Sequence, residues 1–120
     1  MDQTFGKNLR LKRRADISRM FDEGVRVGNG QMALLVVPND LGFARFGVGV
    51  SKRHGPAVRR NRIKRLCREA FRLSRADMPP GWDYFALPRT DAELTLEGLG
   101  ASLRSLARRA VDKAEKGRRG

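Results

Sequence analysis

The sequence has 120 residues and a mass of 13.5 kDa, a size that fits one domain with a single modest core. It contains 26 Lys and Arg residues and 13 Asp and Glu residues, which gives a net charge of +13. This charge indicates that the binding partner is a nucleic acid or another anionic surface, and it argues against an acid-rich glycosidase or a calcium buffer. The single cysteine excludes an intrachain disulfide or a multi-cysteine zinc site, and the lack of a signal peptide or a long apolar run favours a cytoplasmic protein.

The first part of the chain predicts a short arm and then a helix. Residues 1–11 lack a steady hydrophobic period, and we expect them to form a flexible basic arm. Ile17, Met20 and Phe21 recur at helical spacing and predict a helix over about 14–23.

Three strands are expected next, at about 25–27, 31–37 and 43–51. In the third, apolar side chains alternate with Arg45, Gly47 and Gly49, which share the opposite face. Glycine weakens a strand. The two glycines therefore indicate either close approach of a partner to the backbone, or a bulge or an overlying helix.

The second half predicts a helix, a strand and a final helix. The helix spans about 56–74, the strand 82–87, and Thr95 is a candidate N-cap for the last helix. Residues 115–120 are expected to be a disordered tail. The order helix-strand-strand-strand-helix-strand-helix predicts a small α+β two-layer sandwich, with residues 1–120 forming a single RNA-binding domain.

The positive charge is concentrated on the central helix and the residues just before it. Between Ser51 and Arg75 there are ten Lys or Arg residues and one acid, Glu69. One face of the helix is aliphatic, whereas the opposite face is cationic, and like charges at this spacing destabilise an isolated helix. Arginines in its first turns oppose the helix dipole, so the pattern favours an arriving phosphate. The candidate contacts are Lys52, Arg53, Arg59, Arg60, Asn61, Arg62, Lys64, Arg65, Arg68 and Arg72.

Further basic residues gather near both ends of the chain. A solvated surface explains the C-terminal group as well as binding of an anionic partner does. The N-terminal group has no acid and comprises Lys7, Arg10, Lys12, Arg13 and Arg14.

No catalytic constellation is visible. Cys67 falls on the apolar helix face and is expected to be a buried core thiol, while His54 is expected at the surface or against a phosphate. The acids are scattered, so we predict no catalytic residue and no metal ligand in the protein.

The stretch GVGVSKRHGPAVRRNRIKRLCREAFR, residues 47–72, resembles the signature region of the bacterial ribonuclease P protein component. Its core RRNRIKR is highly specific to that family, and RLKRRADISRMFDEGVRV, residues 10–27, is similar to the family's N-terminal helix and following strand. The resemblance implies a fold with a left-handed strand-helix-strand crossover, against the general handedness rule.

The resemblance also implies the function. The protein would be the non-catalytic subunit of the endoribonuclease ribonuclease P, binding the catalytic RNA and the 5′ leader of precursor tRNA during 5′ maturation. Mg²⁺ would be bound mainly by the RNA, which performs the hydrolysis, and neither a membrane nor an obligate protein partner is implied. The candidate contacts on the central helix would face the catalytic RNA.

The resemblance places a leader-binding cleft between the sheet and the N-terminal helix. Of the positions that are aromatic in the family, only Phe21 keeps a ring here, which favours apolar and backbone contacts over base stacking. Phe21 could equally fill the core. The cleft residues would be Ile17, Phe21, Met32, Leu35, Arg45, Gly47 and Gly49.

Two other functions fit the composition. One is a ribosomal-type or general RNA-binding protein without a processing role. The other is a DNA-binding protein with the central helix in a major groove.

Overall fold

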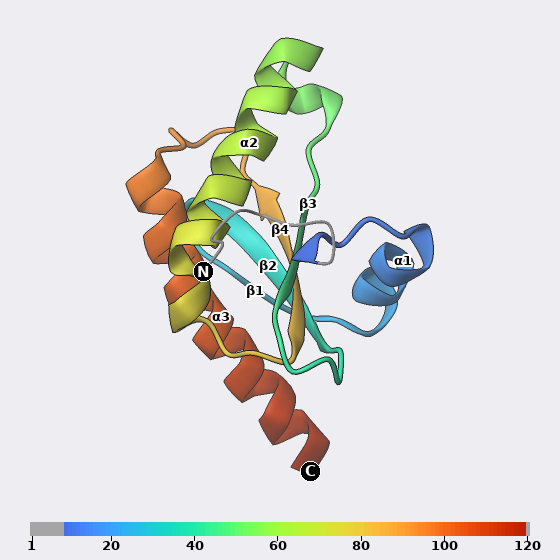
Figure 1. Cartoon of the computed structure of the whole chain (residues 1–120). Helices are drawn as coiled ribbons and strands as arrows, with labels where there is room; N and C mark the ends of the chain where they lie inside the picture. The colour runs from blue at the N-terminus through green and yellow to red at the C-terminus, as the bar shows by residue number, and fades with distance from the viewer. Residues whose placement is uncertain (1–8, 120) are drawn as a thin grey trace.

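The structure, a computed structural model, describes residues 9–119 and places helices on both faces of one four-stranded sheet (Figure 1). The order of helices and strands is the predicted one, with two short 3-10 helices, η2 and η3, on either side of the central helix. The elements are α1 Arg14–Glu23, β1 Val25–Gly28, β2 Met32–Pro38, β3 Arg45–Val48, η2 Lys52–His54, α2 Ala57–Ser74, η3 Arg75–Asp77, β4 Trp82–Pro88 and α3 Leu96–Arg119.

The sheet has the strand order β1-β2-β4-β3. β2 pairs antiparallel with β1 and with β4, whereas β3 runs parallel to β4 and is joined to it through α2. The α+β class is confirmed; the left-handed sense of this crossover stays a prediction.

One face of the sheet holds the main core, beneath α2 and α3 (Figure 1). Apolar side chains from alternate strand positions meet the apolar stripes of both helices, because a strand turns every second side chain to the same face. The rings of Phe46 and Phe71 stack here with centroids 4.7 Å apart. Cys67 is fully buried in this core, as predicted.

The opposite face is only partly covered. A smaller cluster joins Met20 of α1 to Leu35 and Phe85 of the sheet and to Leu11 of the N-terminal segment. Because α1 is short, it lies against one region of this face only (Figure 1). We call this side of the sheet the open face.

Two segment boundaries differ from prediction. Leu9 and Leu11 are buried, and the Leu11 N–H donates to the Phe46 carbonyl (2.9 Å), so the described end of the arm is fixed against β3. The part of the predicted arm at 1–8, which includes Lys7, lies outside the described residues. At the other end α3 continues to Arg119 where a tail was expected from 115, since its apolar stripe extends to a buried Ala114. None of the helices within 9–119 could cross a membrane.

Candidate nucleic-acid interface

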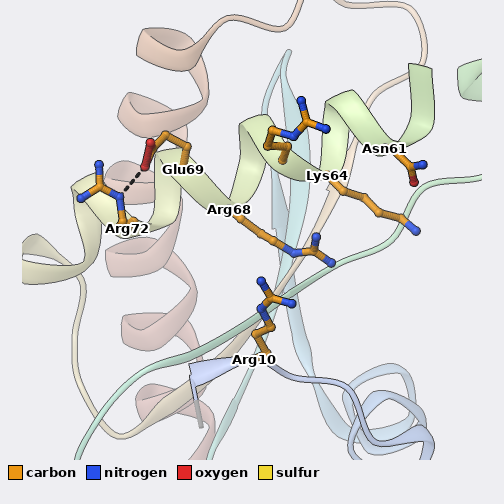
Figure 2. Close-up of a pocket in the computed structure, with 7 residues that line it drawn as sticks. Arg10, Asn61, Lys64, Arg68, Glu69 and Arg72 are labelled. Atoms are coloured by element: carbon orange, nitrogen blue, oxygen red, sulfur yellow. Dashed lines mark hydrogen bonds and ion pairs between the residues drawn. The ribbon is translucent and has the colours of Figure 1, made fainter. Parts of the chain in front are cut away.

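The cationic face of α2 forms one wall of a pocket of about 450 Å³ (Figure 2). The opposite wall is Arg10, on the N-terminal segment that pairs with β3. Inside this pocket the Arg72 guanidinium forms an ion pair with the carboxylate of Glu69, which is the one acid among the lining residues. We call this the basic pocket; its lining residues are Arg10, Asn61, Lys64, Arg65, Arg68, Glu69 and Arg72.

The two-faced character of α2 follows from its sequence. Ile63, Cys67 and Phe71 recur at helical spacing and are buried in the core, which turns the intervening polar side chains outward. The predicted division of this helix into an apolar and a cationic face is confirmed.

Arg68 and Arg10 approach each other across the basic pocket (Figure 2). Burial, together with the nearby positive charge of Arg10, lowers the pKa of Arg68. The guanidinium groups of Arg10 and Arg68 therefore lie close together in a partly dehydrated site, where their combined positive charge would stabilise a bound anion.

The remaining candidate contacts do not all belong to this pocket. Arg59 and Arg62 line a separate hollow of about 400 Å³, between α2 and residues 92–96. Arg60 donates to the Gly55 carbonyl (3.1 Å) at the start of its own helix. Lys52 and Arg53 are exposed on η2. The sequence predicts one continuous cationic patch, but the structure divides these residues among several surfaces. The side chains point in different directions around α2, which has the N-terminal segment on one side and residues 92–96 on the other.

A narrower groove of about 280 Å³ continues from the basic pocket onto the open face. Lys64 and Arg68 belong to both hollows, so the two are adjacent. Ile17 and Phe85 supply its apolar surface beside the glycine-containing end of β3. We call it the leader groove, after the leader-binding cleft that the family resemblance implies on this face.

Phe21 lies beside this groove rather than in the core. Its side chain is 53% exposed, and its ring meets that of Phe85 edge to face with centroids 5.7 Å apart. The alternative that Phe21 fills the core is therefore wrong, because Met20 takes that role. Leu35 is buried beneath the open face.

Phe85 is a site residue that the sequence analysis missed. Strand alternation within 82–87 places it on the same face as Asp83 and Leu87, a pattern that could have identified it. The Phe85 side chain is buried and forms the floor of the groove, whereas Phe21 presents an exposed ring.

Gly47 of β3 and Gly49 just after it are explained by neighbours in the same chain. A Cβ at Gly47 would lie 2.9 Å from Phe85 Cδ1 and 3.1 Å from Leu11 Cβ, and one at Gly49 would lie 3.0 Å from Phe85 Cε2. The close approach is therefore made by the N-terminal segment and by the Phe85 ring, rather than by a bulge or a helix.

Met32 and Arg45 do not fit the cleft to which they were assigned. Met32 is 1% exposed in the main core, because the even-numbered positions of β2 face α3. Arg45 forms a two-bond ion pair with buried Asp83 (2.8 and 2.6 Å) and lies 3.6 Å from Asp16 of α1. Its charge is thus used to hold α1 against the sheet.

His54 is buried, contrary to expectation. Its Nδ1 accepts from the Ser51 N–H (3.0 Å), which leaves Nε2 to donate to the Pro88 carbonyl (2.8 Å). The residue connects η2 to the end of β4.

The described acids, cysteine and histidine do not assemble into a reactive centre. Within 9–119 no three His, Cys, Asp or Glu side chains are grouped so as to hold a metal ion. Burial raises the pKa of Cys67 to about 12, which keeps it a thiol. The chemistry available to the surfaces above is the binding of phosphates and bases.

Known proteins with similar sequences and folds share one description. Residues 5–111 match the family described as Ribonuclease P. The ribonuclease P protein component of Halalkalibacterium halodurans is 38% identical over 106 residues, covering 87% of this chain and 89% of its own. That of Thermotoga petrophila is 37% identical over 89 residues, covering 74% and 76%.

Two solved structures have the same architecture. The ribonuclease P protein from Thermotoga maritima matches with a TM-score of 0.75 at 30% identity, covering 83% of this chain and 96% of that one. The ribonuclease P protein from Staphylococcus aureus matches with a TM-score of 0.70 at 30% identity, covering 88% and 94%.

Proposed function

The chain belongs to the bacterial ribonuclease P protein component family, and from this premise we propose that it binds precursor tRNA through its 5′ leader while α2 contacts the ribonuclease P RNA. As such a component it is the non-catalytic subunit of an endoribonuclease and a partner of the ribonuclease P RNA. The roles of the individual surfaces are the part that we propose.

The single observation that carries this assignment is the continuity of two different surfaces. The basic pocket offers guanidinium and ammonium groups, which bind backbone phosphates. The leader groove that adjoins it is lined by Ile17 and the buried Phe85, and the exposed Phe21 ring, which lines a neighbouring hollow with Ile17, suits an unpaired base. A single strand leaving the catalytic RNA at Lys64 and Arg68 would therefore enter the groove directly.

Recognition in the groove is expected to be tolerant of base sequence. Stacking on the exposed Phe21 ring uses the face that every base has, so it does not depend on which base is present. The leader would be held mainly through its backbone and through stacking.

Mg²⁺ is the metal that the family resemblance implies. The described residues do not fit it as a protein-bound ion, since their carboxylates are not grouped and Asp83 is occupied by Arg45. We therefore propose that Mg²⁺ is bound by the RNA. We also place the protein in the cytoplasm, a reducing compartment in which a lone Cys67 stays reduced.

The test is cleavage of precursor tRNA by a bacterial ribonuclease P RNA at low Mg²⁺, with and without the protein. We expect the protein to stimulate cleavage and to raise the affinity for precursor over mature tRNA. The RNA-free protein should not cleave. Stimulation without any preference for precursor tRNA would contradict the leader assignment.

A further inference from the structure

The first turn of α1 is tied to the sheet by a side chain of β3. Two nitrogens of the Arg45 guanidinium, Nε and Nη2, donate to the two carboxylate oxygens of Asp83 (2.8 and 2.6 Å). The third nitrogen, Nη1, lies 3.6 Å from Oδ2 of Asp16 on α1. Arg45 therefore bridges one acid of the sheet and one acid of the helix. We call Asp16, Arg45 and Asp83 the α1 latch.

The sheet side of the α1 latch is held by further hydrogen bonds. The buried carboxylate of Asp83 also accepts from the Asn39 side-chain amide (2.8 Å), and the same amide donates to the Phe43 carbonyl (3.1 Å). These bonds join β4 to the turn between β2 and β3. Because two parallel hydrogen bonds to one carboxylate fix the plane of a guanidinium, the fold itself holds Nη1 of Arg45 beside Asp16.

The helix side depends more on its contacts with the sheet. α1 has ten residues, and its N-cap residue, Arg13, makes no capping hydrogen bond through its side chain. A helix of this length is unstable in isolation. Met20 packs against the sheet, and Arg19 donates to the Pro38 carbonyl (3.2 Å). The α1 latch adds an ion pair at the first turn, ahead of both of these contacts.

The α1 latch connects the two sides of the leader groove. Residues 46–48 of β3, the strand that carries Arg45, line one side. Ile17, the neighbour of Asp16 in the chain, lines the groove from α1 and also lines the hollow beside it. Phe21 follows Ile17 by one helical turn on the same face of α1. A change in the distance between Asp16 and Arg45 would therefore move the side chains that we assign to leader binding.

A carboxylate at this place is unfavourable for RNA binding on charge alone, since it repels backbone phosphates. From its geometry we propose that Asp16 is a positioning residue for the precursor leader. Acting through Arg45, it holds the first turn of α1 where Ile17 and Phe21 face the leader. The proposal rests on the proposed leader-binding function and extends it to a residue that does not itself contact the leader.

The experiment compares variants in holoenzyme reconstituted with the ribonuclease P RNA. Asp16→Asn removes the charge from the α1 latch and keeps the size of the side chain. Ala15→Asp/Asp16→Asn restores an acid to the first turn, at an exposed position about 100° away around the helix, so net charge is kept while the α1 latch is lost. Asp77→Asn is the control, because Asp77 is an exposed acid of η3 outside the basic pocket and the leader groove.

We expect Asp16→Asn to bind precursor tRNA up to about fivefold more weakly, which corresponds to about 1 kcal/mol, the upper range for a partly exposed ion pair. Binding of mature tRNA and of the ribonuclease P RNA should not change. Ala15→Asp/Asp16→Asn should bind precursor tRNA at least as weakly as Asp16→Asn. Asp77→Asn should not weaken either tRNA, because loss of an acid by itself favours binding of a polyanion.

Four outcomes would overturn the proposal. Unchanged or tighter precursor binding by Asp16→Asn would show that the α1 latch does not position the groove. Recovery of wild-type affinity in Ala15→Asp/Asp16→Asn would show that Asp16 acts through the helix dipole. Equal losses for precursor and mature tRNA would separate the α1 latch from the leader. If wild type itself showed no preference for precursor over mature tRNA, the leader function on which the proposal rests would be refuted instead.

Discussion

Arg10 and Arg68 direct their guanidinium groups toward each other across the basic pocket, although 57 positions separate them in the sequence (Figure 2). Arg10 is held there because its segment pairs with Phe46 of β3, and Arg68 because α2 is anchored by its apolar face. Two like charges in fixed positions raise the free energy of the RNA-free fold, and a phosphate placed between them removes that penalty.

The first prediction concerns this pair. Arg68→Gln should weaken binding of the ribonuclease P RNA by about 1.5–3 kcal/mol, since charge-assisted hydrogen bonds are lost. The free energy of unfolding without RNA should stay the same or rise slightly, because a repulsion has been removed. Binding titrations and urea unfolding measure the two quantities, with Arg108→Gln as the matched control. A clear loss of stability in Arg68→Gln would show that the two charges do not repel one another in the free protein.

The second prediction uses the division of the cationic residues of α2 between two hollows. Arg65 lines the basic pocket and Arg62 lines the hollow beside residues 92–96, and both side chains are exposed. Arg62→Ala and Arg65→Ala should each weaken binding of the ribonuclease P RNA by about 1.5–3 kcal/mol, with folding intact. Because they share no pocket, the effects should add in the double variant. Unfolding of either variant, with normal RNA binding by its folded fraction, would show that the face of α2 was assigned wrongly.

Features that depend on a local repeat could be predicted from the sequence. The helix expected at 14–23 coincides with α1, and the alternation in β3 places Phe46 in the core and Gly47 on the open face. The apolar and cationic faces of α2 follow from the same kind of periodicity. In each case neighbouring residues encode the face directly, so no knowledge of distant partners is needed.

Features that depend on distant contacts could not be predicted. Arg45 looked available to RNA because its partner Asp83 lies on another strand. Met32 was assigned to the wrong face, since the pairing that decides which side of β2 meets α3 is not contained in the strand itself.

The third prediction concerns the ion pair between Arg45 and Asp83. Asp83 is 1% exposed, and its carboxylate also accepts from the Asn39 amide (2.8 Å). Arg45→Gln should lower the free energy of unfolding by about 3–5 kcal/mol, because a buried carboxylate loses its partner. Asp83→Asn in the same chain should recover part of that loss. Urea unfolding of the single and double variants measures both effects, and a loss below about 1 kcal/mol in the single variant would show that water replaces the guanidinium.

The fourth prediction is a dependence of stability on alkaline pH. Burial raises the pKa of Cys67 from 9.0 to about 12 in the folded protein. As pH rises above about 9, the unfolded thiol loses its proton first, so the unfolded state binds fewer protons. Stability should therefore fall with pH, with this thiol contributing at most about 1.4 kcal/mol per pH unit, until the folded thiol also ionises.

Comparison with Cys67→Ala isolates the contribution of this thiol from every other source of alkaline instability. The alkaline decline in the free energy of unfolding should be shallower in the variant. A thiol reagent should modify native wild type only as fast as the protein opens. Parallel pH profiles for the two proteins, or rapid labelling of the native thiol, would contradict the prediction.

The last prediction separates two rings that touch each other but differ in burial. Phe21 is exposed beside the leader groove, whereas Phe85 is buried among the side chains of the smaller cluster. Phe21→Ala should reduce the affinity for precursor tRNA by about 1–3 kcal/mol, the usual contribution of a ring that stacks on a base. The affinity for mature tRNA and the melting temperature should change little.

Phe85→Ala is the contrasting variant, because it empties part of a packed cluster and should cost about 3–5 kcal/mol of stability. Melting temperature and both tRNA affinities are measured for each variant, together with Phe21→Leu, which keeps an apolar side chain but cannot stack. If stacking holds the leader, Phe21→Leu should lose precursor affinity almost as Phe21→Ala does; if apolar contact suffices, it should bind like wild type. A large drop in melting temperature for Phe21→Ala, without selective loss of precursor affinity, would place this ring in the folded framework and not in the leader groove.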